Sequence, residues 1–243
     1  GDNWTRISDD ISFKAKITTI AFGAGGSYLY AGGRYENSDY GAIFRSTNNG
    51  DNWEETSVDW TGSEAGHVSK LAVQPGSTDL FWITEGEGFS GRMYRCDEVD
   101  TEGVISLSCT GVNTGWPGPN NPEDIQFNPS NGQDILVSGN KPARTTNDGV
   151  NWYFYTGSHS PFQSSAVAFD SSLATTIFAG NLQGFYLTDA ASTFSGSAYT
   201  GAWNKEVTGM SGLVPKYMAI SGEDPLSVYI NTDGAGIYHT ADG

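Results

Sequence analysis

Residues 46–53 read S-T-N-N-G-D-N-W, and this pattern returns twice more in the chain. Residues 145–152 repeat it as T-T-N-D-G-V-N-W. The third copy is completed only by joining the two ends, because residues 240–243 read T-A-D-G and residues 1–4 read G-D-N-W. A motif divided in this way predicts that the termini meet in space and that the repeating units close into a ring.

The pattern resembles the Asp box, S/T-x-D-x-G-x-x-W. Such a box is a hairpin turn in which the Ser/Thr and Asp/Asn side chains hydrogen-bond to the turn backbone, Gly takes a positive φ and Trp packs back over the hairpin. We therefore assign its positions a structural role. They are Ser46, Asn48, Gly50 and Trp53, then Thr145, Asn147, Gly149 and Trp152, and finally Thr240, Asp242, Gly1 and Trp4.

Short apolar runs with period-two alternation recur through the whole chain in five units. We align the units on Ala21, Ala72, Gln126, Ala168 and Ala219. Alternation, short strands and regular turn signals predict a four-stranded antiparallel blade for each unit. The sequence thus predicts an all-β, five-bladed β-propeller in a single domain, closed by an N-terminal strand that completes the last blade. The expected blades are residues 8–56, 57–112, 113–156, 157–207, and 208–243 together with 1–7.

The composition is typical of a turn-rich β protein. The 243 residues include 32 glycines, with 13% aromatic and only 16% charged residues, and the formal net charge is −16. Nucleic acids and anionic membrane surfaces attract basic surfaces, so this charge argues against both as partners. No apolar run approaches the ~18 residues of a membrane-spanning helix, and we expect no membrane insertion.

Two cysteines, Cys96 and Cys109, allow one disulfide. In a cytosolic protein they would be two buried thiols, but the acidic, aromatic-rich composition favours a secreted protein with a disulfide. Cys96 occupies the repeat position of Ser46 in a unit that has lost its box. A bond between the cysteines would fasten that hairpin and contribute about 3 kcal/mol.

Function on a propeller is expected where the loops that enter the innermost strands meet the loops that join the second and third strands. The entering loops are residues 8–16, 57–67, 113–123, 157–163 and 208–215, and the joining loops are 32–40, 84–90, 138–142, 180–183 and 231–235. Aromatic rings there can stack on sugars, and carboxylates can accept hydrogen bonds from hydroxyls. The candidate ligand-binding residues are Tyr35, Trp60, Glu64, Phe89, Trp116 and Asp233.

The sequence offers no motif for a cofactor. His67 and His159 lack a paired metal-ligand spacing, so we predict no metal site. An acidic loop face could hold Ca²⁺, which prefers oxygen ligands, but the chain carries no Ca²⁺ loop motif.

Residues 41–53, G-A-I-F-R-S-T-N-N-G-D-N-W, look like the G-A-I-x-R-S-T-D-x-G-x-x-W segment of xyloglucan-specific endoglucanases. The units with boxes also resemble blades of sortilin-type receptors. The first resemblance implies action on a plant or fungal polysaccharide. Those glucanases place their substrate between two propellers, whereas this chain is long enough for one.

Three functions remain open. The first is a secreted, lectin-like or interaction propeller that binds glycan through its aromatic and acidic loops. The second is a glycoside hydrolase, which needs two facing carboxylates; the candidates are Asp124, at the start of an innermost strand, and Glu85, at the end of a second strand in the neighbouring unit. The third is a structural or assembly subunit with a protein partner.

Overall fold

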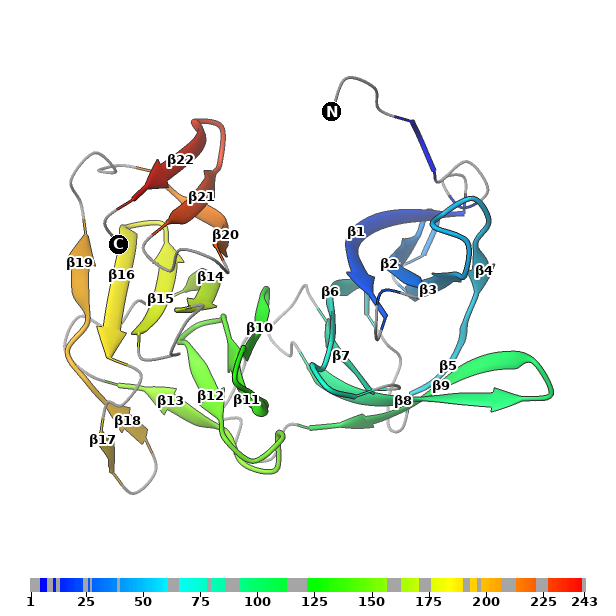
Figure 1. Ribbon diagram of the computed structural model, residues 1–243, viewed down its shortest axis with the longest axis horizontal. Coiled ribbons are helices and arrows are strands. Elements are labelled where there is room, and N and C mark those ends of the chain that lie inside the picture. Colours follow the sequence, from blue (N-terminus) through cyan, green and yellow to red (C-terminus); the bar gives the residue numbers. More distant parts are fainter. Residues whose placement is uncertain are drawn as a thin grey trace. The chain divides into compact units, whose positions relative to one another are not determined.

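The computed structural model describes most of the chain, and it divides into two compact units, Gly1–Val112 and Asn113–Gly243 (Figure 1). The regular structure of the described residues consists of strands in five small, mostly antiparallel sheets. The predicted class is therefore confirmed: the chain is an all-β protein built from the blades of a five-bladed β-propeller. The described residues are 5–7, 11, 14–23, 26, 28–38, 40–60, 66–77, 80–85, 92–112, 122–156, 163–170, 176–189, 193–195, 198–206, 213–221 and 227–241.

The first unit contains two blades. The first blade has the order β1-β2-β3-β4 and is antiparallel throughout. Its strands are β1 (Ala15–Phe22), β2 (Leu29–Tyr35), β3 (Gly41–Ser46) and β4 (Glu54–Glu55). The second blade has the order β5-β9-β8-β7-β6. Its strands are β5 (Ser57–Trp60), β6 (Val68–Val73), β7 (Leu80–Glu85), β8 (Met93–Thr101) and β9 (Val104–Gly111).

Strand β5 corrects one expectation. Residues 57–67 were predicted to be a loop that enters the second blade, but residues 57–60 pair in parallel with β9. The long hairpin of β8 and β9 presents a free edge to the chain as it leaves the first blade, and β5 takes up that edge's backbone hydrogen bonds.

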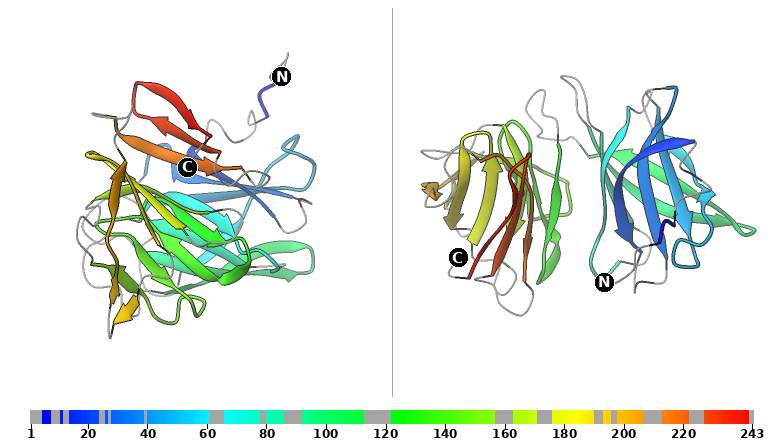
Figure 2. Two further views of the ribbon diagram at one scale, coloured as in Figure 1. Left: turned by 60° about the vertical axis from the view of Figure 1, so that its left-hand side comes forward. Right: turned by 90° about the horizontal axis from the view of Figure 1, so that it is seen from above.

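The second unit contains three sheets, which Figure 2 shows as separate twisted sheets in green, yellow and red. Two of them have the four-stranded core that the repeat predicts, β10-β11-β12-β13 and β14-β15-β16-β19. The strands are β10 (Ile125–Asn128), β11 (Asn131–Val137), β12 (Ala143–Thr145), β13 (Tyr153–Tyr155), β14 (Ser164–Phe169), β15 (Thr176–Asn181), β16 (Gly184–Asp189) and β19 (Asn204–Glu206).

An inserted hairpin extends the third blade. The segment between β16 and β19 has no box and instead forms β17 (Thr193–Ser195) and β18 (Ala198–Thr200), and β18 pairs in parallel with β13 of the preceding blade. The third sheet consequently has six strands.

The last blade has three strands among the described residues: β20 (Pro215–Ile220), β21 (Val228–Thr232) and β22 (Gly236–Thr240). The expected fourth strand was to come from residues 4–7. Trp4 lies outside the described residues, and residues 5–7 carry no strand. The Ile7 carbonyl instead accepts a hydrogen bond of 2.7 Å from the Trp53 indole within the first unit.

The turn at residues 46–53 has the hydrogen bonds expected from its sequence. The Ser46 hydroxyl donates to the Asn48 side-chain oxygen and accepts from the Gly50 amide at 2.9 Å. The same Asn48 oxygen accepts from the Asn52 amide at 2.9 Å. Gly50 has a φ of 93°, and the Trp53 side chain is buried.

The turn at residues 145–152 repeats this arrangement. Thr145 accepts from the Gly149 amide at 3.1 Å, and Asn147 accepts from the Asn151 amide at 3.0 Å. An Asn side-chain oxygen is thus the acceptor at the same place in both turns. In the third copy Thr240 ends β22, whereas Asp242, Gly1 and Trp4 lie outside the described residues.

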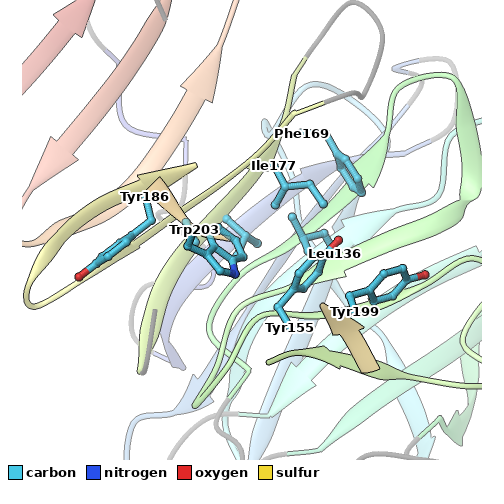
Figure 3. Packing of buried hydrophobic residues seen from close by; sticks show 9 residues of the cluster. Leu136, Tyr155, Phe169, Ile177, Tyr186, Tyr199 and Trp203 are labelled. Carbon is cyan, nitrogen blue, oxygen red and sulfur yellow. The ribbon is translucent and has the colours of Figure 1, made fainter. Parts of the chain in front are cut away.

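Buried side chains between neighbouring blades form the core of each unit. In the second unit the Tyr155 ring stacks on Tyr199 at 5.0 Å and meets Trp203 edge-on at 5.4 Å (Figure 3). In the first unit Cys96 and Cys109 form the predicted disulfide, with both residues fully buried. Within the described parts of the chain, no helix is long and apolar enough to cross a membrane.

Candidate functional site

A pocket of about 250 Å³ opens in the second unit. Five of the loops expected to carry function supply residues to it: 113–123, 138–142, 157–163, 180–183 and 208–215. The loops that were predicted from the sequence to be functional thus surround a pocket in this unit. The pocket is lined by Glu123, Gly139, Asn140, Gln163, Ser164, Ser165, Leu182, Val214 and Lys216.

Backbone hydrogen bonds hold one wall of the pocket. Gly139 and Ser164 form an isolated antiparallel bridge, with N–H to O distances of 3.0 and 2.7 Å. The Gln163 amide donates to the Asn140 carbonyl at 2.9 Å. Gln163 has a φ of 56°, a left-handed conformation that is uncommon for a residue other than Gly. These bonds fix the joining loop of the third blade against the innermost strand of the fourth.

A side-chain hydrogen bond holds the opposite wall. The Ser165 hydroxyl donates to the Pro215 carbonyl at 2.5 Å, which links the fourth blade to the fifth. The first unit repeats this bond, because Thr18 donates to the Val68 carbonyl at 2.5 Å. Thr18 and Ser165 each lie three residues before the aligned position of their blades. We call this the bridging position.

The bridging position carries a different chemistry in two blades of the pocket. There Glu123 of the third blade and Lys216 of the fifth replace the hydroxyl, and both line the pocket. The Glu123 carboxylate cannot form the bridging bond, because it has no proton to donate. The Lys216 ammonium has donors, but among the described residues it makes no such bond. The exchange of a hydroxyl for a charge is thus confined to residues that face this pocket in the second unit.

Glu123 as a residue is exposed, but partial burial is the largest influence on its carboxyl group and raises the pKa of that group. The Lys216 ammonium opposes this effect, and the Asp124 carboxyl adds to it. Lys216 is half-buried and, within the described part of the chain, makes neither a hydrogen bond nor an ion pair. The two charges therefore influence each other across the pocket without direct contact.

Asp124 lies behind the pocket rather than in it. Its side chain is 1% exposed. One carboxyl oxygen accepts from the Ile125 amide at 3.0 Å, and the other accepts from the Val167 amide of the fourth blade at 3.3 Å. Thr19 accepts from the Leu71 amide at the equivalent place in the first unit, at 3.2 Å. Asp124 thus makes a link between blades that a neutral hydroxyl makes elsewhere.

The second candidate catalytic acid, Glu85, ends β7 in the first unit. Its side chain lies outside the described residues, as does that of Trp60 at the end of β5. Glu64, Phe89 and Trp116 also lie outside the described parts of the chain. The geometry of a site made from these residues remains a prediction.

Two of the predicted ligand-binding residues are described. Tyr35, at the end of β2, donates its hydroxyl proton to the Glu55 carboxylate. Burial, followed by this hydrogen bond, raises the pKa of the Tyr35 phenol to about 12. Asp233 is exposed in the turn after β21, and its amide donates to the Val214 carbonyl at 3.0 Å. Asp233 therefore supports the loop that lines the pocket.

Neither the bridging position nor Lys216 was predicted from the sequence. The signal was present in the alignment of the five sequence repeats, where the bridging position reads Thr, Ser, Glu, Ser and Lys. Lysine is neither aromatic nor acidic, so the aromatic and acidic content of the loops did not indicate Lys216. No group of three or more His, Cys, Asp or Glu side chains that could hold a metal ion occurs among the described residues.

Comparisons with known proteins identify the fold. No protein-family model and no curated protein matches the sequence. The GH74 xyloglucanase from Xanthomonas campestris is similar over 97% of this chain, with a TM-score of 0.67 and 16% identity. YCF48 from Cyanidioschyzon merolae is similar over the whole chain, with a TM-score of 0.60 and 16% identity. An ancestral GH74 enzyme matches 96% of the chain, with a TM-score of 0.56 and 17% identity.

This chain spans 38% of the Xanthomonas enzyme, 32% of the ancestral enzyme and 73% of YCF48. At such low sequence identity the similarity shows a common β-propeller fold.

Proposed function

We propose that this chain is a secreted, lectin-like propeller that binds glycan in the pocket of the second unit. The observation that carries the proposal is the lining of that pocket, which combines an acid, a cation and two side-chain amides. Sugar hydroxyls both donate and accept hydrogen bonds. Glu123 offers acceptors, Lys216 offers donors, and Asn140 and Gln163 offer both.

Binding is favoured over hydrolysis by the number of acids. Glycoside hydrolysis by the common mechanisms needs two carboxyl groups that flank the scissile bond. Glu123 is the one carboxylate among the described residues that line the pocket. A site of this composition can orient a sugar but lacks a described partner acid.

A hydrolase is the second candidate, and the raised pKa of Glu123 is the observation that favours it. A carboxyl group that stays protonated at higher pH can act as a general acid. Such an enzyme would need its second carboxylate from a loop outside the described residues. Asp124 and Glu85 remain the acids proposed from the sequence, although the burial and backbone bonds of Asp124 suit a structural role better.

The disulfide supports an extracellular location, because disulfides persist in oxidising compartments. The GH74 structures are fold neighbours of this chain, and the turns at residues 46–53 and 145–152 have the hydrogen bonds of Asp boxes. These features support a secreted propeller of the Asp-box type.

The test is a binding titration of the intact chain with soluble xyloglucan, β-glucan and chitin oligosaccharides, followed by mass analysis of the sugars. We expect Gln163→Ala and Asn140→Ala to weaken binding about tenfold each, as for hydrogen bonds made to a ligand. Gln133→Ala is the matched control, because Gln133 is an exposed amide on β11 that does not line the pocket.

Shortened sugars in the same incubation would support the hydrolase instead. Glu123→Gln, Asp124→Asn and Glu85→Gln would then identify the acids, because an essential acid abolishes turnover when it becomes an amide. If the sugars are neither cut nor bound by the native chain, both candidates are contradicted and a protein-binding propeller is favoured.

A further inference from the structure

We infer that the pocket selects a neutral sugar whose adjacent hydroxyls bridge Lys216 and Glu123, and that it rejects glycans charged at this point. The inference rests on the proposed glycan-binding function. It adds the class of ligand and the two residues that set it.

Two charged side chains stand where other blades have a hydroxyl. Glu123 and Lys216 occupy the bridging position, at which Thr18 and Ser165 connect neighbouring blades. In the third and fifth blades the side chain at this position is charged and lines the pocket. Replacing a link between blades by a charge removes a stabilising bond, which is a pattern expected of binding sites.

Lys216 is half-buried and lines the pocket, and its ammonium forms no hydrogen bond or ion pair with another described residue. A partly desolvated charge without a partner is unfavourable. An oxygen atom supplied by a ligand would complete its coordination, because an ammonium has three donors.

The opposite charges of Glu123 and Lys216 favour a ligand without a charge. An anionic sugar that binds Lys216 would also bring its carboxylate near Glu123, in a chain with a net charge of −16. An amino sugar that binds Glu123 would bring its ammonium near Lys216. A hydroxyl group avoids both conflicts, because its oxygen accepts from Lys216 and its proton is donated to Glu123. Adjacent hydroxyls on one sugar ring can do both at once.

Matched pairs of oligosaccharides test the class of ligand. Hexose oligomers of the gluco, galacto and manno series are titrated beside the hexuronate oligomers of the same series, which differ in having a carboxylate at C6. We expect at least one neutral series to bind about tenfold more tightly than its uronate counterpart, the size of one charge-assisted contact. Tighter binding of the uronate would overturn the inference and leave the proposed function standing.

Two variants test the residues. Lys216→Met keeps the length of the side chain and should weaken binding of the neutral sugar about tenfold. Glu123→Gln should weaken the neutral sugar less, since an amide still accepts a hydrogen bond, and should raise the relative affinity for the uronate. Lys205→Met is the matched control, because Lys205 is an exposed lysine of β19 that does not line the pocket. Equal behaviour of the two lysine variants would overturn the inference.

A measurement without ligand distinguishes a failure of the inferred ligand class from a failure of the proposed glycan-binding function. The carboxyl of Glu123 is titrated by NMR in the native chain and in Lys216→Met. Because the Lys216 ammonium lowers the pKa of Glu123, its removal should raise that pKa further, whereas Lys205→Met should leave it unchanged. An unaltered pKa in Lys216→Met would show that the two charges do not share the pocket, whatever the chain binds. Binding of no glycan, with the predicted pKa change, would contradict the proposed function together with the inferred ligand.

Discussion

Two repeat positions behave differently in this molecule. The residue before each of the two internal turns, Arg45 before residues 46–53 and Arg144 before residues 145–152, is an arginine that forms an ion pair in both places. The bridging position changes from a hydroxyl at Thr18 and Ser165 to a charge at Glu123. The two arginines thus have structural contacts, whereas the bridging position carries a charge at two of the three places where it lines the pocket.

The two arginines also differ in how well they are paired. Arg144 holds Asp134 of the same blade through two bonds of 2.7 Å. Arg45 reaches Glu98 of the next blade at 3.3 Å, and the Tyr30 hydroxyl donates to the same carboxylate. A conserved residue type therefore does not imply a conserved partner, because the neighbouring strand decides which acid is available.

Loss of the Arg144 guanidinium should have the largest effect on stability. Arg144→Met leaves the buried Asp134 carboxylate unpaired and should lower the free energy of unfolding by about 3 kcal/mol. Arg45→Met removes a longer bond and should cost about 1 kcal/mol. Chemical denaturation of the chain checks both values. Equal losses would contradict the difference in pairing, and neither variant should change glycan binding.

The disulfide should be next in size. Replacing both Cys96 and Cys109 by Ser should lower the free energy of unfolding by roughly 3 kcal/mol, because the unfolded chain gains conformational entropy. The loop is short, because the two cysteines are separated by 13 positions in the sequence. Differential scanning calorimetry of the native chain and the double variant measures the loss. A larger loss from Ser46→Ala than from the cysteine pair would contradict the idea that the disulfide fastens the hairpin that lacks a box.

The boxes should each contribute less. Ser46→Ala and Thr145→Ala remove the acceptor for the Gly50 and Gly149 amides, and each should cost about 1–2 kcal/mol. The two losses should be similar, because the two turns have the same bonds. Denaturant unfolding compares them, and a change in glycan affinity in either variant would assign the boxes a role beyond stability.

The sequence was sufficient for much of the fold because its signals are local. Alternating runs such as residues 17–22 and 166–169 specified strands, and the box residues specified their own turns. The pairing of Cys96 with Cys109 was expected because the chain has two cysteines and its acidic, aromatic-rich composition favours a secreted protein. Strand β5 and the β17–β18 hairpin were missed, because each is added to the edge of another sheet, and such pairing depends on which edge lies nearby.

The site was harder to predict for a physical reason. Its lining comes from three blades, and local sequence cannot say which loops converge. Asp124 was chosen as an acid at a strand start, but the strand buries it and turns its oxygens to backbone amides. Glu123, one residue earlier, points into the pocket. The two acids immediately precede β10, and only one of the two adjacent side chains is available to a ligand there.

The smallest predicted effect concerns pH and the first unit. Tyr35 has a phenol pKa raised from 10.0 to about 12. Since the folded pKa lies above the unfolded one, the stability from this group is complete below pH 10 and is lost as the pH rises toward 12. Between pH 10 and pH 12 the free energy of unfolding should therefore fall less in Tyr35→Phe than in the native chain. Denaturant unfolding at several pH values measures this, and an equal fall in the two proteins would contradict the Tyr35–Glu55 hydrogen bond.

The most direct test of the account is to locate the bound sugar. The isotopically labelled chain is titrated with the neutral oligosaccharide that binds best, and backbone amide shifts are followed by NMR. The account predicts that the largest changes occur at Asn140, Gln163, Ser165 and Lys216, around the pocket of the second unit. Changes confined to the loops of the first unit, or the absence of any change at saturating sugar, would contradict it.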